Sequence, residues 1–173
     1  MRRIGGEGSS LIKKNKMPRH QYKKTKSESD PVYESLEVAK LINYIMEHGK
    51  KNVARKIVYT TIENLKKEEN DALMTLNKAI SNVMPDREVR PRRLGGASYL
   101  VPTEVRRSRR LYLALNWIIE AASGRSNKEF KSYANKLTAE IIEASKNQGS
   151  AVAKKQQTEK LAEQNKAFSH LKW

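Results

Sequence analysis

The chain has 173 residues, a length typical of one domain or of one domain with a tail. Lysine and arginine number 35 against 19 acidic residues, and the formal net charge of +16 points to a polyanionic partner, either nucleic acid or an anionic membrane surface. The absence of cysteine excludes disulfides and thiolate sites, and no apolar run approaches the roughly 18 residues that a membrane span needs.

The positive charge is concentrated in three segments. Residues 1–30 carry nine basic and three acidic side chains, residues 87–110 carry eight and two, and residues 146–173 carry six and two. The intervening segments, 31–86 and 111–145, are each neutral. We therefore expect binding appendages on a neutral helical body, in preference to a solvated surface without a partner.

The first 30 residues form a predicted N-terminal arm. They hold three glycines, five serines or threonines and almost no apolar periodicity, so we expect this segment to be disordered when alone. Residues 31–173 are expected to form one helical domain. Asp30 and Pro31 are typical of a helix start, with Asp30 as the N-cap of a first helix that stops at Gly49.

Helical spacing of apolar residues continues after that glycine. It predicts a second helix from Ala54 to Leu65, and a third that Asp71 caps and that ends before Pro85. After residue 106, Ser108 opens a fourth predicted helix.

Residues 87–106 have a different pattern, which predicts a β-hairpin, here called the ribbon, around a turn at Gly95-Gly96. Pro91 and Pro102 would each remove a ladder donor, so both strands should be edge strands. A two-stranded ribbon with no covering layer, and with four arginines on its first strand, is expected to project from the body as an arm.

Two more helices are predicted after the fourth. Ser126 and Glu129 form a capping box for a fifth helix. Residues 150–168 have high helix propensity but few apolar anchors, so we expect a sixth helix that is weakly held and rests on something outside the core. The predicted fold is mainly α, a six-helix bundle-like body with a protruding β-hairpin between helices three and four.

Catalytic chemistry finds little support in the sequence. The three histidines lie in unrelated segments without a metal-ligand spacing. Gly49-Lys50 fails as a phosphate-binding loop, because Tyr44 and Lys51 stand where that motif needs glycine and serine or threonine. We therefore expect no enzyme activity, no metal and no cofactor.

Nucleic-acid binding fits the basic segments better. All eight basic residues between positions 87 and 110 are arginine, whose planar guanidinium binds phosphate through two hydrogen bonds and stacks on bases. The turn at Gly95-Gly96 would let the backbone approach a ligand. Tyr99 could stack on a base, and packing across the ribbon is an equally good interpretation.

Three collinear motifs resemble the universal small-subunit ribosomal protein seven family, of bacterial or organellar type. They include residues 49–51 (Gly-Lys-Lys), then 92–99 with 101–106, then 151–155 with 162–170. Together the blocks cover roughly residues 30–173 in the family's order.

The resemblance implies a helical body of six helices with a β-ribbon, and a structural role in translation. Such proteins bind small-subunit rRNA in its 3′ major domain early in assembly and nucleate the head. They lie at the subunit interface near the exit tRNA site. The expected partners are rRNA, the nearby tRNA, head proteins including protein nine, and platform protein eleven, with the chain a monomer in the ribosome and no membrane partner.

Residues for RNA contact follow from the resemblance and from the arm and ribbon. The expected contacts in the arm are Arg2, Arg3, Lys13, Lys14, Arg19, Lys23, Lys24 and Lys26. Those in the body and ribbon are Lys50, Lys51, Arg90, Arg92, Arg93, Gly95, Gly96, Tyr99, Arg106, Arg107, Arg109, Arg110, Lys154 and Lys155.

Two departures from the family pattern carry expectations of their own. Pro91 stands where relatives usually have a small residue, so we expect the first strand to be shorter or bulged. Met17-Pro18-Arg19 resembles the usual bacterial start, so residues 1–16 are expected to be an extension. The expected location is the ribosome of a bacterial cytoplasm, with a mitochondrial or plastid ribosome as the alternative.

Two other classes compete with this interpretation. A DNA-bending architectural protein also combines helices with a basic ribbon, but it usually dimerises and carries an apolar wedge at the ribbon tip. The tip here, Gly95-Gly96-Ala97-Ser98, offers no wedge. An RNA-modifying enzyme would need a nucleophile, a metal set or a cofactor loop, which the motifs do not supply.

Overall fold

The computed structural model describes residues 28–69 and 71–171. Within them the order of elements is α1 (Leu36–Ile45), α2 (Lys51–Glu68), α3 (Ala72–Val83), β1 (Arg87–Leu94), β2 (Ala97–Glu104), α4 (Arg107–Gly124), α5 (Tyr133–Ser145), α6 (Ser150–Gln164) and the 3-10 helix η1 (Lys166–Leu171). The predicted mainly α fold with a hairpin between helices three and four is confirmed. Nearly all of the predicted N-terminal arm, with its eight basic candidates, lies outside the described residues.

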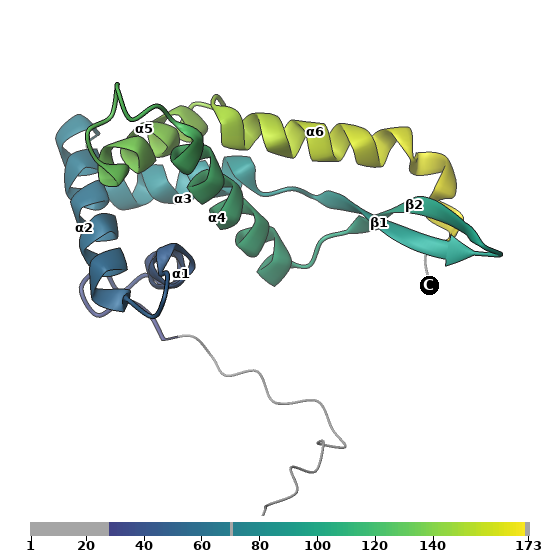
Figure 1. Ribbon diagram of the computed structural model, residues 1–173, viewed down its shortest axis with the longest axis horizontal. Helices are drawn as coiled ribbons and strands as arrows, with labels where there is room; N and C mark the ends of the chain where they lie inside the picture. Colours follow the sequence, from purple (N-terminus) through teal and green to yellow (C-terminus); the bar gives the residue numbers. More distant parts are fainter. Residues whose placement is uncertain (1–27, 70, 172–173) are drawn as a thin grey trace, which may run out of the picture.

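Helices α1 to α5 form a packed body, and the ribbon and α6 extend from it side by side (Figure 1). The core is built from one apolar stripe of each helix, with Leu41, Ile62, Leu76, Leu115 and Ile141 each at most 2% exposed. These positions follow the helical periodicity of the sequence, because residues three or four apart share a face. The body therefore supplies a rigid base for the ribbon.

The first helix begins later than Asp30-Pro31 suggested, so that prediction is wrong. Ser35 is the N-cap of α1, and its hydroxyl accepts the Val38 N–H. The Asp30 carboxylate instead accepts backbone N–H groups within the turn at residues 31–33 and the Tyr59 hydroxyl from α2. A side chain that caps a turn has the same local signature as one that caps a helix.

The start of the fifth helix also differs from its prediction. The capping box at Ser126 and Glu129 is wrong, because α5 begins at Tyr133 with Ser132 as its N-cap. The Ser126 hydroxyl accepts the Lys128 N–H within a turn that precedes the helix.

The ribbon is regular along its whole length. The expectation that Pro91 shortens or bulges β1 is wrong, since all eight residues of β1 pair in register with β2. In an antiparallel pair, hydrogen-bonded and non-bonded positions alternate. Counted from the two-residue turn, Pro91 and Pro102 both lie at non-bonded positions. The same alternation makes Asp86 and Val105 a hydrogen-bonded pair, and the Val105 N–H does donate to the Asp86 carbonyl. Neither proline therefore removes a ladder bond.

The ribbon tip explains its two glycines. Gly95 and Gly96 have φ of +55° and +90°, which are the left-handed conformations of a type I′ turn. This turn matches the twist of the strands and places the tip at the far end of the molecule from α2 (Figure 1).

The ribbon and α6 cover each other, which corrects two expectations at once. The ribbon was expected to lack a covering layer and α6 to be weakly held, but α6 packs along β1 and β2, and η1 packs on β2. Val101 is fully buried and Ala162 nearly so, although both lie outside the main core. Because cross-strand partners share a face, one face of the ribbon is covered and the other is open.

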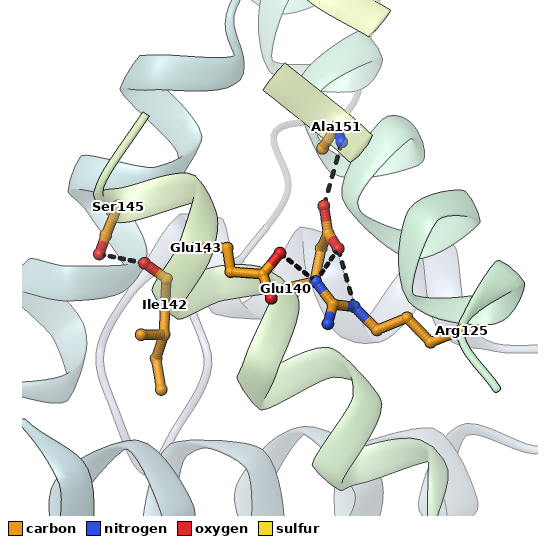
Figure 2. Close-up of polar contacts among 6 residues, drawn as sticks. All are labelled: Arg125, Glu140, Ile142, Glu143, Ser145 and Ala151. Carbon is orange, nitrogen blue, oxygen red and sulfur yellow. Dashed lines mark hydrogen bonds and ion pairs between the residues drawn. The ribbon is translucent and has the colours of Figure 1, made fainter. Parts of the chain in front are cut away.

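The start of α6 is fixed by a buried carboxylate from α5. Glu140 is fully buried, and its Oε1 accepts the Ala151 N–H at 3.0 Å. Its Oε2 accepts two hydrogen bonds from the Arg125 guanidinium, at 2.9 and 2.6 Å, and Arg125 also binds Glu143 (Figure 2). These bonds set the direction in which α6 leaves the body.

Candidate nucleic-acid interface

Two helices begin with basic residues and no side-chain cap. Lys50 is the N-cap of α2 and Lys51 its first residue, and Arg106 and Arg107 occupy the same positions at α4. All four side chains are exposed, and neither helix has an acidic residue in its first turn. Both starts lie on the lower side of the molecule in Figure 1.

At the start of each of the other four described α-helices, a side chain accepts backbone N–H groups. The N-caps Ser35, Asp71 and Ser132 accept backbone N–H groups at α1, α3 and α5, and Glu140 does so for α6. A helix start carries free N–H groups and about half a positive charge, which basic neighbours oppose and an anion complements. The starts of α2 and α4 are thus electrostatically prepared for phosphate groups.

The arginines at the base of the ribbon have a second role within the fold. The largely buried Glu88 of β1 accepts hydrogen bonds from Arg90 at 2.5 and 2.8 Å, and from Arg109 of α4 at 3.4 Å. Arg110 of α4 pairs with Asp86, just before β1. The ion pairs of Arg109 and Arg110 tie the base of the ribbon to α4, and Arg90 and Arg109 remain about half exposed.

The two faces of the ribbon separate residues that the sequence grouped together. Arg92 is half-buried on the covered face and has a polar or ring interaction there, whereas Arg93 is exposed on the open face. Tyr99 lies on the covered face, with its ring 5.3 Å from that of Phe168 in η1. The tyrosine therefore packs against the C-terminal 3-10 helix.

The basic pair of α6 lies apart from the helix starts. Lys154 Nζ is 2.5 Å from a carboxylate oxygen of Glu120 in α4, and Lys155 Nζ donates to the Asn82 carbonyl of α3 at 2.9 Å. In Figure 1, α6 runs along the upper side, whereas α2 and α4 begin on the lower side. Both lysines fasten α6 to the body.

Comparison with known proteins identifies the family. A sequence model of the family described as ribosomal protein S7p/S5e matches residues 17–166. The chain belongs to this family. The S7p/S5e family is a structural, non-enzymatic component of the ribosome, so the prediction of no enzyme activity is confirmed and the DNA-bending interpretation is not supported.

Bacterial relatives of the S7p/S5e family match most of the chain. The small ribosomal subunit protein uS7 of Caldanaerobacter subterraneus subsp. tengcongensis is 52% identical over 145 residues, which cover 83% of this chain and 91% of the relative. That of Caldicellulosiruptor bescii is 48% identical over 159 residues, covering 91% and 100%. That of Thermotoga maritima is 46% identical over 158 residues, also covering 91% and 100%.

Sequence reasoning missed an exposed aromatic pair in this S7p/S5e chain. The rings of Tyr44 in α1 and Tyr112 in α4 are 5.5 Å apart and perpendicular, and the Arg109 guanidinium lies 5.0 Å from the centre of the Tyr112 ring. Two signals were available: Tyr112 closely follows a segment with four arginines, residues 106–110, and Tyr44 lies off the apolar stripe of its helix. Their contact depends on the packing of α1 against α4.

Residues 28–69 and 71–171 contain neither a metal-binding cluster nor a membrane-spanning helix. There, no three histidine, aspartate or glutamate side chains group closely enough to hold a metal ion. Over the same described residues, no helix is both long and apolar enough to cross a membrane.

Proposed function

We propose that this chain is a structural constituent of the small ribosomal subunit that binds the 3′ major domain of rRNA early and nucleates assembly of the head. The family match over residues 17–166 carries the proposal, supported by relatives named as small ribosomal subunit proteins. In the assembled subunit the chain is a monomer at the subunit interface near the exit tRNA, in contact with head proteins including protein nine and with platform protein eleven. The bacterial origin of the relatives favours a ribosome in a bacterial cytoplasm.

The mechanism rests on fixed positive groups. Lysines and arginines that meet phosphates release condensed counterions, which drives association and makes it depend on salt. Lys50, Lys51, Arg106 and Arg107 are held at helix starts, so little further ordering is needed when phosphates arrive. The covered ribbon adds a stiff projection, which suits recognition of RNA by its shape.

A filter-binding titration of the full chain tests this function. One RNA is a transcript of the 3′ major domain of bacterial small-subunit rRNA, and the other is an unrelated structured RNA of equal length. At moderate salt we expect clearly tighter binding to the rRNA domain. Equal affinity for the two RNAs would contradict the proposal.

Replacing Arg93 with alanine is expected to weaken binding to that transcript and to leave thermal stability unchanged. Arg93 is exposed on the open face of the ribbon, and one lost phosphate contact lowers the slope of log K against log salt by about 0.7 to 0.9. Arg92→Ala is the matched control, because Arg92 lies on the covered face and its loss should also lower the melting temperature. An unchanged slope in Arg93→Ala would remove this residue from the interface.

A further inference from the structure

A hollow of about 410 Å³ lies where α1, α2, α4 and α5 meet. Its lining includes Tyr44, His48, Lys50, Val53 and Tyr133. Volumes of this order and a mostly apolar lining with a few polar groups are typical of small-ligand sites. The hollow opens beside the basic start of α2, whose N-cap Lys50 is part of the lining.

The hollow lies at one end of a row of side chains. Lys50 and Tyr44 line it, the Tyr44 ring contacts Tyr112, and Tyr112 lies against the Arg109 guanidinium. The row therefore runs from the start of α2, across α1, to the first turn of α4. It joins the two uncapped helix starts through a pair of aromatic rings.

The tyrosine pair is not explained by packing of the core. Tyr44 is 37% exposed and Tyr112 is 38% exposed, and both lie beside, not on, the buried stripes of their helices. The Tyr133 ring is more enclosed, and burial raises the pKa of its phenol. Its hydroxyl donates to the Ile119 carbonyl at 3.3 Å, and the residue forms part of the lining of the hollow.

We propose that this row, Lys50–Tyr44–Tyr112–Arg109, binds an unpaired RNA nucleotide whose base stacks on Tyr44 at the hollow and whose neighbouring phosphates meet Lys50 and Arg109. The proposal rests on the proposed function and adds a single-stranded contact to it. The cations at both ends of the row favour a polyanion over an apolar segment of a protein partner. Glu47 also lines the hollow, where its carboxylate can accept a hydrogen bond from an exocyclic amine of the base.

The first test compares Tyr44→Ala with Tyr44→Phe in filter binding of the full chain to the 3′ major domain transcript. A stacked base is worth about 1–3 kcal/mol, so Tyr44→Ala should weaken binding by roughly 5- to 150-fold. Tyr44→Phe keeps the ring and should bind like the unaltered chain. Met74→Ala, which removes a 68% exposed side chain of α3, is the control for loss of surface apolar area and should have no effect.

The dependence on salt separates stacking from charge. Tyr44→Ala should lower affinity without changing the salt slope, whereas Lys50→Gln should lower the slope by about 0.7 to 0.9. Dimethyl sulfate probing of the same complex should show at least one base that the unaltered chain protects and that Tyr44→Ala leaves reactive. Equal affinity and equal protection for Tyr44→Ala and Tyr44→Phe would overturn the proposal.

A second variant keeps the proposal testable if Tyr44→Ala disturbs the fold. Val53 is 54% exposed at the third position of α2, where glutamate favours a helix start, so Val53→Glu should fold and yet repel phosphate at the hollow. We expect weaker binding to the transcript. Unchanged RNA affinity with reduced incorporation into subunits would instead assign the hollow to a protein partner, and failure of the unaltered chain to prefer the transcript would refute the proposed function itself.

Discussion

Replacing Glu140 with alanine is expected to lower the free energy of unfolding by about 3–5 kcal/mol, because it leaves a largely buried guanidinium without one of its two carboxylate partners, the fully buried one. Glu140 is fully buried between Arg125 and the start of α6 (Figure 2). The hydrogen bond to Glu143 is the largest cause that raises the pKa of Arg125; burial lowers this pKa, and the hydrogen bonds to Glu140 raise it further. The guanidinium therefore stays charged in the variant. The Ala151 N–H would lose its acceptor as well.

Urea denaturation with matched variants measures this effect. Glu143→Ala removes a more exposed carboxylate from the same arginine and should cost below about 1 kcal/mol. Glu140→Gln keeps an oxygen for the Ala151 N–H and should fall between the two. Amide exchange should accelerate first in α6 and the ribbon of Glu140→Ala, because α6 covers that ribbon. Equal losses for Glu140→Ala and Glu143→Ala would contradict the role of the buried carboxylate.

Changing the four basic residues at the uncapped helix starts to glutamine is expected to give the largest loss of RNA affinity. Loss of Lys50, Lys51, Arg106 and Arg107 as phosphate contacts should lower the salt slope by about 3 and the affinity at 0.15 M salt by about 10²- to 10³-fold. The same changes should leave the stability of the free protein equal or slightly higher, since positive charge at a helix start is unfavourable.

A charge-matched variant controls for the loss of net charge. Lys56, Lys67, Lys78 and Lys131 are also exposed, and they lie in the neutral segments of the sequence. Changing these four to glutamine should alter the slope and the affinity far less. If the two quadruple variants bind the 3′ major domain transcript equally, binding follows overall charge and the helix starts have no special part in it.

Periodicity in the sequence was sufficient to predict the helices but not where two of them begin. The apolar stripes of α2 and α3 lie where residue spacing placed them, and Asp71 caps α3 as expected. Asp30 and Ser126 were assigned to helix starts because a turn uses the same local hydrogen bonds. The position of the Asp30 side chain is fixed by a hydrogen bond from the Tyr59 hydroxyl, 29 residues away. The local sequence cannot reveal this partner.

The relation between the ribbon and α6 shows the same limit at a larger scale. From the sequence, each was expected to pack weakly: the ribbon had no covering layer, and α6 had few apolar anchors. They are separated by the whole of α4 and α5, so their packing is a tertiary contact that no local pattern encodes. The buried Glu140 of α5 likewise binds residues outside its own helix, Arg125 at 15 residues and Ala151 at 11 residues along the chain.

The candidate interface was predictable in composition but not in arrangement. The family resemblance identified Lys50, and the basic segment 87–110 identified Arg90, Arg93, Arg107 and Arg110, without distinguishing their surroundings. The structure separates the free helix starts from arginines that also bind Glu88 and Asp86. The Arg110–Asp86 pair joins α4 to the base of the ribbon, so it depends on side chains that meet only after the ribbon has docked on α4.

The most direct test of the account is co-sedimentation of the full chain with small ribosomal subunits through a sucrose gradient after a high-salt wash. A structural constituent held by many phosphate contacts and by neighbouring proteins should remain with the small-subunit peak in near-equal molar amount. The variant with glutamine at all four helix-start positions should be depleted from that peak. Complete release of the unaltered chain into the supernatant, with the subunits intact, would contradict the account.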